Sequence, residues 1–562
     1  MTHNQESICR WCLASFIIDA EDLDYLQRLS PSIGGQLLPL PAPTLCPACR
    51  IRRRLSFRND QNYYRGECSL CAVPLITIYS PDKRLPILCE GCYWSDRWDP
   101  YAYGRQYDFD RPFFEQFAEM KAEVPRLAIF NTISENSKFT VHASRNKNCY
   151  MSSSLIECED VCYSDFLGSA KNSIDLFSGR RNELCYECSH SEDCYASSHL
   201  ELCYGLTESY QCYDCRGCNS LVGCAGLRKT DGYILNRPAS IEECRSTVHR
   251  LNRDPEFKRT FDLEFENLKM AHPRPAYWGV NSEGSTGNYL TNCKDVTSGF
   301  NVRGCRDSRH VYECFDLVDS YDATRVANGE MLYECKGIVD LKYSAFCNLT
   351  YQCSLMLYCD NCQAGCQNCF GCMSLKRGEY SILNVRYSPA EYQKIAAAVA
   401  AQMQATGEWG EFFPPELSPF GYNETKASDI FPLERQTAVG RGWHWSDYEQ
   451  PLPHGVSVIE RSSVPMDIDQ VGDEVLKSAI RCEESGRPFR IVAQELEFYR
   501  SRGLPIPAVS PRVRLRRRIA RQNRPVLYNR FCDECGAGIV STYETTRPEI
   551  VFCEGCYLKR VY

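Results

Sequence analysis

A Cys-Tyr dipeptide recurs every nine residues in the middle of the chain, from Cys185-Tyr186 to Cys212-Tyr213. A short fixed period with small polar residues between its members is typical of a stacked repeat. Nine residues suit a short strand and a turn. Two or three units per coil would form a β-solenoid or parallel β-helix with an inward ladder of Cys and Leu. Helical repeats are the alternative, but the Ser, Asn, Asp, Gly and Tyr content disfavours them. The register is occupied at Cys149, Cys158, Leu167, Leu176, Cys185, Cys194, Cys203 and Cys212.

The repeat region is itself duplicated. A shift of 147 residues places Cys188 on Cys335, and a shift of 148 places Asn236 on Asn384. Each half ends in a stretch of helical composition, from Ile241 to Met270 and from Ala390 to Thr406. We therefore expect two solenoid halves, each closed by a helix that caps its open edge.

Both ends of the chain carry paired Cys-x2-Cys motifs. Two such knuckles supply four thiolates at the corners of a tetrahedron, which is the closed structural site that Zn²⁺ prefers. The spacing within two of the sets falls in the zinc-ribbon range. The alternative is a set of buried or redox-active thiols. The predicted ligands are Cys9, Cys12, Cys46 and Cys49 in the first set, Cys68, Cys71, Cys89 and Cys92 in the second, and Cys532, Cys535, Cys553 and Cys556 in the third.

The C-terminal module looks like a second copy of the N-terminal one. A shift of 464 residues aligns residues 46–93 with residues 510–557 without a gap. Only Cys482 remains of the set that corresponds to Cys9 and its partners, because the other three positions hold Ser485, Ser510 and Val513. One thiolate cannot close a four-ligand site, so we predict three zinc ions and not four.

Both module copies keep a run of arginines between their ribbons. Arginine clusters near aromatic residues can clamp phosphates and stack on bases. The alternatives are a solvated helix face or arginines that pair with acidic surface on the same chain. The candidate nucleic-acid contacts are Arg50, Arg52, Arg53 and Arg54 in the first copy and Arg514, Arg516, Arg517 and Arg518 in the second.

Two patterns suggest chemistry within the repeat. Cys362-x3-Cys366-x2-Cys369 has the spacing of an iron–sulfur loop, in which three thiolates leave one iron open. The duplicate half does not reproduce it, because Cys369 falls on Leu221, so a buried thiol ladder is favoured over iron or zinc here. Four carboxylates could cut polysaccharide, although outward positions of a stacked strand explain them better. They are Glu187, Asp193, Glu201 and Glu208.

Composition narrows the class of protein. The 562 residues are 43% hydrophobic and 24% charged, which excludes a disordered chain. A net charge of −8 excludes a general polyanion binder and confines any such role to a local patch. No run of about 18 apolar residues and no signal-peptide pattern is visible. We therefore expect a cytoplasmic protein with no membrane partner, whose 36 cysteines stay reduced.

These patterns predict a mainly β, multidomain chain with a β-solenoid or parallel β-helix-like core in two duplicated halves, flanked by duplicated zinc-ribbon modules. The expected divisions are a double zinc-ribbon module at 1–100, a connector at 101–147, solenoid halves with capping helices at 148–285 and 286–406, a connector rich in Pro and aromatic residues at 407–480, and a degenerate plus an intact zinc ribbon at 481–562.

Three segments carry a resemblance to other proteins: Cys46-Pro-Ala-Cys-Arg50, Cys89-Glu-Gly-Cys-Tyr93 with the following Trp-Ser-Asp96, and Thr406 to Pro414. Most of the chain resembles a group of cysteine-rich proteins predicted in bacteria with reduced genomes. That group combines zinc ribbons with a Cys/Tyr repeat core. No activity is established for it, so the resemblance implies an architecture and no function.

We expect a non-catalytic zinc-binding protein whose ribbons and arginine runs bind nucleic acid or a ribonucleoprotein, with the repeat core as a spacer. A protein–protein interaction scaffold that binds no nucleic acid is the close alternative. An iron–sulfur or carbohydrate-directed enzyme ranks last. The sequence does not identify the ligand.

Overall fold

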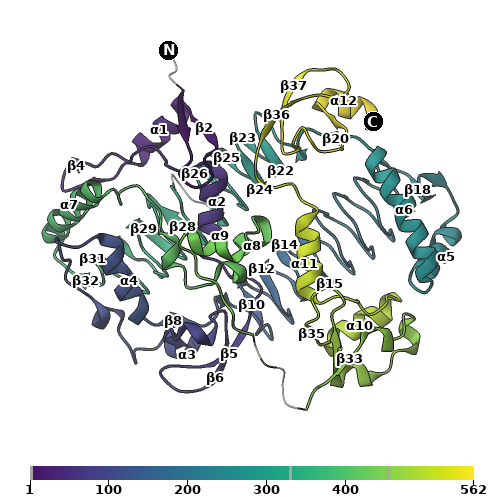
Figure 1. Cartoon of the computed structure of the whole chain (residues 1–562), viewed down its shortest axis with the longest axis horizontal. Helices are drawn as coiled ribbons and strands as arrows, with labels where there is room; N and C mark the ends of the chain where they lie inside the picture. The colour runs from purple at the N-terminus through teal and green to yellow at the C-terminus, as the bar shows by residue number, and fades with distance from the viewer. Residues whose placement is uncertain (1–3, 328–331, 450, 452–454) are drawn as a thin grey trace. The chain divides into compact units, whose positions relative to one another are not determined.

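A computed structural model describes residues 4–327, 332–449, 451 and 455–562. The chain has many short strands, but it is mixed, with 26% helix and 28% strand. It therefore contains more helix than the mainly β class predicts (Figure 1). The chain divides into two compact units. Unit 1 comprises Met1–Ile129, Tyr277–Tyr448 and Arg524–Leu527, and unit 2 comprises Phe130–Ala276, Glu449–Asn523 and Tyr528–Tyr562.

The repeat region of unit 2 forms a long parallel stack in which residue i pairs with residue i+12. Tyr186 pairs with Ser198, Ser198 with Tyr210, and Tyr210 with Val222. We call this stack, residues 131–234, the unit 2 ladder, and each set of twelve residues a layer. Its strands are β9 (Asn131–Thr132), β10 (Thr140–Val141), β11 (Ala143–Ser144), β12 (Ser152–Ile156), β13 (Glu159–Cys162), β14 (Asp165–Gly168), β15 (Lys171–Ile174), β16 (Phe177–Arg180), β17 (Asn219–Val222) and β18 (Asp231–Ile234), which also pairs with β19 (Arg237–Pro238).

Every third residue of this ladder, from Glu157 to Lys229, has a left-handed backbone. Each layer thus consists of four triplets, in which one residue pairs with the next layer, one turns the chain and one points inward. The inward residues Leu200, Cys203 and Leu206 are at most 2% exposed. Left-handed geometry costs most residues roughly 1–2 kcal/mol. The inward contacts must therefore offset that cost at each turn.

Inward cysteine and serine side chains make hydrogen bonds that leucine cannot make. Cys185 Sγ donates to the carbonyl oxygens of Glu183 at 3.4 Å and Cys194 at 3.3 Å. Ser197 Oγ donates to a carbonyl of its own layer at 2.9 Å and accepts the N–H of Ser209, one layer on, at 3.0 Å. Buried amides need such partners. Small side chains that donate and accept therefore suit the interior of this ladder.

The nine-residue period of the sequence equals three triplets, whereas one layer of the ladder contains four. Successive Cys-Tyr pairs therefore lie on successive sides of the stack. The expectation of two or three nine-residue units per coil is wrong, because a layer contains twelve residues. Nine and twelve are both multiples of three, so every member of the nine-residue register still points inward. Its first and last members, Cys149 and Cys212, are 2% and 0% exposed.

The repeat region of unit 1 forms an equivalent unit 1 ladder, residues 279–327 and 332–382. Phe300 pairs with Tyr312, and Tyr312 with Thr324. Near its end one extra residue enters, so that Asp360 pairs with Met373. Its strands are β21 (Gly279–Val280), β22 (Gly287–Thr291), β23 (Lys294–Thr297), β24 (Gly299–Arg303), β25 (Arg306–Arg309), β26 (Val318–Tyr321), β27 (Val326–Ala327), β28 (Ile338–Lys342), β29 (Tyr351–Leu357), β30 (Gln367–Phe370) and β31 (Glu379–Ile382), which also pairs with β32 (Val385–Arg386).

Helices follow each ladder and pack on its last layers. α5 (Ile241–Leu251) and α6 (Pro255–Ala271) follow the unit 2 ladder, and α7 (Pro389–Thr406) follows the unit 1 ladder. Ser240 starts α5 and Ser388 starts α7, each with a capping box to a glutamate three residues on. The two serines are 148 residues apart, which is the spacing of the duplicated halves.

Each ladder packs with a cysteine-containing terminal module that is distant in the sequence. The N-terminal module belongs to unit 1 with the second ladder, and the C-terminal module belongs to unit 2 with the first. The other elements of unit 1 are β1 (Gln5–Ile8), β2 (Ser15–Ile18), α1 (Ala20–Leu29), β3 (Ser32–Ile33), β4 (Gln36–Leu37), α2 (Pro47–Leu55), β5 (Tyr64–Glu67), β6 (Pro74–Thr77), β7 (Ile87–Leu88), α3 (Glu90–Tyr93), α4 (Phe113–Glu123), β8 (Arg126–Leu127), α8 (Lys426–Ile430) and α9 (Arg435–Gly440). Those of unit 2 are β20 (Arg274–Pro275), β33 (Ser457–Ile459), β34 (Ser478–Arg481), β35 (Pro488–Phe489), α10 (Ala493–Arg502), α11 (Pro511–Ala520), β36 (Tyr528–Phe531), β37 (Gly538–Ser541), β38 (Val551–Phe552) and α12 (Glu554–Val561).

Ser197→Ala tests the role of the inward hydrogen bonds. The variant leaves the buried N–H of Ser209 without its acceptor, so the free energy of unfolding should fall by about 1–3 kcal/mol. Ser197→Cys restores a donor and an acceptor and should recover most of the loss. Ser246→Ala, on the exposed face of α5, is the matched control. Chemical denaturation of the full chain measures all three, and an undiminished stability of Ser197→Ala would refute this role.

Candidate metal centres and arginine helices

Three sets of four cysteines bring their sulfur atoms together. In each set all four Sγ atoms lie within 4.8 Å of one another, so the three sets could hold three metal ions. The sets contain the twelve cysteines that the Cys-x2-Cys spacing predicts, in the predicted groups. They are Cys9, Cys12, Cys46 and Cys49, then Cys68, Cys71, Cys89 and Cys92, and finally Cys532, Cys535, Cys553 and Cys556.

The sulfur spacing in these sets fits a tetrahedral ion. Four thiolates that bind a metal at about 2.3 Å place neighbouring sulfurs about 3.8 Å apart. The Sγ–Sγ distances are 3.7 Å for Cys12 and Cys46, 3.8 Å for Cys71 and Cys89, and 3.7 Å for Cys535 and Cys553. A closed set of four protein thiolates leaves no position for a substrate. Such a centre stabilises a fold and does not perform chemistry.

Local backbone geometry positions both halves of each set. The first Cys-x2-Cys is followed by a left-handed residue that closes a tight turn: Leu13, Ala72 or Gly536. The second pair begins a helix, where the positive end of the helix dipole favours a thiolate. The N-cap residues are Cys46 for α2, Cys89 for α3 and Cys553 for α12.

Backbone amides also favour the metal-binding form of these thiols. Burial acts to raise the pKa of Cys68, but N–H groups of Cys89, Leu70 and Cys71 lower that pKa to about 6. The Cys89 N–H lies 3.3 Å from the Cys68 sulfur. The pKa of Cys532 is lowered to about 6 in the same way. Thiolates at neutral pH are the form that a metal ion binds.

The degenerate set of the C-terminal module replaces metal ligands with hydrogen bonds. Ser510 stands at the position of Cys46, and its Oγ caps α11 by accepting the N–H of Val513 at 3.4 Å. Val513 packs in an apolar core. The remaining thiol, Cys482, accepts N–H groups from Ser485 at 3.5 Å and Ser510 at 3.3 Å. Among the residues that the structure describes, no fourth four-cysteine set forms.

The iron–sulfur spacing arises from the extra residue in the unit 1 ladder. Cys362, Cys366 and Cys369 are inward residues with 0% exposure. The insertion lies between the first two, where Gly365 has a left-handed backbone with φ +90°. Without it, all three would follow the ordinary spacing of three. The described residues contain no metal-binding group formed by these thiols.

Two arginines of the C-terminal run, Arg514 and Arg518, are buried against the unit 2 ladder. Arg514 donates to Asp175 at 2.6 Å, and Arg518 donates to the other oxygen of that carboxylate at 2.8 Å. Arg518 also pairs with Glu187 at 3.1 Å. Both arginines are at most 2% exposed. Burial acts to lower their pKa, but the Asp175 carboxylate raises the pKa of each, so both stay charged.

The N-terminal module repeats this arrangement on the unit 1 ladder. Arg50 and Arg54 both pair with Asp322, and Arg53 pairs with Glu334. All three arginines are at most 3% exposed. The arginines of the two copies are related by the shift of 464, and the carboxylates by the shift of 147. Both duplications therefore preserve one docking contact.

Five of the eight arginines predicted to contact nucleic acid are thus buried and paired with ladder carboxylates: Arg50, Arg53, Arg54, Arg514 and Arg518. Arg52 is half-buried and lies 5.0 Å from the centre of the Phe431 ring. Arg516 and Arg517 are exposed, and Arg517 pairs with Glu484 at 2.7 Å. The basic surface left by this run is therefore on α11.

The partners of the buried arginines are ladder carboxylates that the sequence patterns did not identify. Asp175 occupies a left-handed position, and Glu187 lies twelve residues on, in the next layer. Their counterparts under the 147-residue shift are Asp322 and Glu334, also acidic. That retained charge is the pattern that could have identified these carboxylates as functional.

All four carboxylates considered for polysaccharide cleavage have basic partners. They are the pairs Glu187–Arg518 at 3.1 Å, Asp193–Arg181 at 2.5 Å, Glu201–Lys269 at 2.6 Å and Glu208–Arg245 at 2.9 Å. Each of the four side chains is therefore held in an ion pair within unit 2.

No protein-family model matches the chain, and none of the curated proteins or solved structures matches it either. Across the described part of the chain, none of the helices has the length and apolarity needed to cross a bilayer.

The metal content distinguishes intact from degenerate sets. We expect three zinc ions per chain by elemental analysis of protein purified without oxygen. Cys553→Ser removes a ligand from the third set and should lower the content to two ions. Cys482→Ser alters the degenerate set and should leave three. Four ions in the unaltered protein, or loss of an ion in Cys482→Ser, would contradict the assignment.

Arg518→Met tests the buried pairing. It leaves the Asp175 and Glu187 carboxylates less compensated in the core, so stability should fall by about 3–5 kcal/mol. Arg517→Met removes an exposed pair and should change stability by at most about 1 kcal/mol. Chemical denaturation compares the two. Equal losses would show that burial of the Arg518 pair is not important.

Proposed function

We propose that this chain is a non-catalytic, zinc-stabilised scaffold of a reducing compartment. Each ladder is interpreted as a β-solenoid of twelve-residue coils, and each ribbon module as a rigid head fixed to one side of it. The surfaces that the solenoids and ribbons present would bind a macromolecular partner. A protein partner ranks ahead of nucleic acid.

The burial of five of the eight predicted arginines carries this proposal. Arg50, Arg54, Arg514 and Arg518 are four of the eight arginines predicted to contact phosphates, and their guanidinium groups are paired with carboxylates inside the units. A charge with a buried partner cannot also bind a phosphate without breaking that pair, which would cost several kcal/mol. Their role is therefore to attach the modules.

The three four-cysteine sets support the same function. Soft thiolates in a closed tetrahedron suit Zn²⁺, which has no redox chemistry and no geometric preference of its own. Binding free energy at such a site contributes directly to folding. Zinc would therefore hold the ribbon hairpins rigid, and recognition would belong to the surfaces between them.

Nucleic acid binding is a second candidate, now confined to one helix face. Arg516, Arg517 and Arg521 are exposed on or next to α11. Arginines on one helix face can contact successive phosphates. Because Arg518 is buried, substitutions there would test stability and not binding.

Copurification with and without nuclease separates the two candidates. For a protein scaffold, specific partners should stay bound to the tagged full chain after nuclease treatment and at moderate salt. For a nucleic-acid binder, partners should be released by nuclease, and binding to RNA or DNA should weaken steeply with salt. Arg516→Ala with Arg517→Ala should abolish only the second behaviour, and Arg487→Ala, another exposed arginine, is the control.

A further inference from the structure

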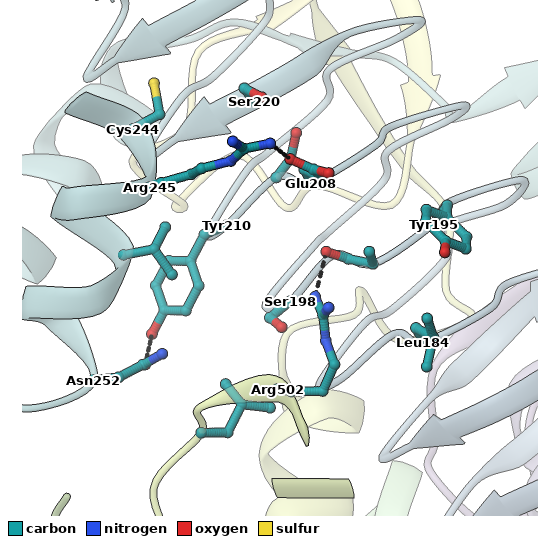
Figure 2. A pocket seen from close by; sticks show the side chains of 14 residues that line it. Leu184, Tyr195, Ser198, Glu208, Tyr210, Ser220, Cys244, Arg245, Asn252 and Arg502 are labelled. Carbon is teal, nitrogen blue, oxygen red and sulfur yellow. Dashed lines mark hydrogen bonds and ion pairs between the residues drawn. The ribbon is translucent and has the colours of Figure 1, made fainter. Parts of the chain in front are cut away.

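A pocket of about 370 Å³ lies in unit 2 between the ladder, α5 and the end of α10. One wall is a column of left-handed ladder residues spaced by twelve, including Ala196 and Glu208. Arg245 projects from α5, and Arg502 is the last residue of α10. Figure 2 shows both arginines directed at the ladder. The volume is in the range of small-molecule sites.

Unit 1 has a pocket of about 300 Å³ at the corresponding place. Its ladder wall includes Leu355, which corresponds to Glu208 under the shift of 147 residues. Its helix wall includes Gln393, which corresponds to Arg245 under the shift of 148 residues. Leu29 ends α1 as Arg502 ends α10. The duplicated architecture thus builds the same pocket twice.

The two pockets differ in charge. Where unit 2 has Glu208, Arg245 and Arg502, unit 1 has a leucine, a glutamine and another leucine at the corresponding positions. The one arginine of the unit 1 lining, Arg28, is paired with Asp24 at 2.9 Å and Asp319 at 3.0 Å. The pocket of unit 2 therefore has a cationic chemistry that the shared architecture does not require.

The guanidinium group of Arg502 has a buried hydrogen-bond donor that no other described residue satisfies. It donates from Nη2 to the carbonyl oxygen of Ala196 at 2.6 Å. Its Nε is buried and has no hydrogen-bond partner among the described residues, and no carboxylate there forms an ion pair with it. Burial lowers the pKa of Arg502, which reflects the cost of this partly desolvated charge. A guanidinium in this state favours an oxyanion as its missing partner.

The rest of the lining would orient such a ligand. Arg245 pairs with Glu208 at 2.9 Å, at the solvent side of the pocket, and its guanidinium has further donors. Tyr195, which is 46% exposed, also lines the pocket. Tyr210 forms a buried wall, with its hydroxyl 3.4 Å from Asn252 Oδ1. One charged anchor surrounded by rings and hydroxyls is typical of a site for a small organic anion.

We infer that the unit 2 pocket binds a small ligand through a carboxylate or phosphate group held by Arg502 and assisted by Arg245. This site is separate from the metal centres and from the docking contact of the arginine helices. It adds a ligand to the scaffold and requires no catalytic step.

Titration calorimetry on the zinc-loaded full chain with inorganic phosphate and, separately, with succinate tests this inference. At least one of the two should bind saturably at one site per chain. Binding of phosphate alone would identify a phosphate ligand, and binding of succinate alone a carboxylate. No saturable binding of either anion up to about 10 mM would overturn the proposal.

Variants then locate the binding. Arg502→Leu, which copies the unit 1 residue, should weaken binding by about tenfold or more, since it removes a charge-assisted hydrogen bond to the anion. Arg245→Gln copies unit 1 at an exposed position and tests the site even if Arg502→Leu folds poorly. Gln393→Ala in the unit 1 pocket is the matched control and should bind as the unaltered chain does. Undiminished binding in Arg245→Gln and in folded Arg502→Leu would overturn the assignment.

Discussion

Arg518 and Asp175 meet at 2.8 Å where neither side chain is exposed, and Arg50 meets Asp322 in the same way in the other unit. A buried ion pair adds little net stability, but removing one partner is costly. Its larger effect is on register. A ladder repeats every twelve residues, so an arginine helix could dock at any layer. Only some layers carry a carboxylate at the docking position, and these carboxylates determine the layer at which the helix docks. We regard this selection as the constraint on which the arrangement of each unit depends.

The same modules show two ways to hold one ribbon. In the intact sets, four thiolates converge on a point that suits a metal ion. In the degenerate set, Ser510 caps α11 and amide groups contact the Cys482 thiol. The helix that follows keeps its arginines in both cases. The docking contact is thus retained where the metal ligands are not, which indicates that attachment to the ladder constrains the module more than the metal does.

The three four-cysteine sets could be predicted because Cys-x2-Cys spacing is local and the chemistry of metal ligands allows few alternatives. The inward register could also be predicted from the sequence. The twelve-residue separation of paired residues could not, because nine and twelve are both multiples of three and give the same inward positions. Burial of Arg514 could not be predicted from its neighbours, because its partner Asp175 is 339 residues away. Nor does a single sequence state that the N-terminal module joins the second ladder. Both facts depend on long-range packing. The sequence indicates that packing only through the acidic residues that both ladders keep at corresponding positions.

Hydrogen exchange on the full chain, before and after zinc is removed by a chelator, tests this account most directly. We expect the ribbon hairpins 5–18, 64–77 and 528–541 to lose protection, because their closure depends on metal. Helices 47–55 and 511–520 should stay protected, since buried pairs with Asp322 and Asp175 attach them to the ladders. Loss of protection in both helices together with the hairpins would contradict the claim that the arginine–carboxylate pairs hold the modules in place.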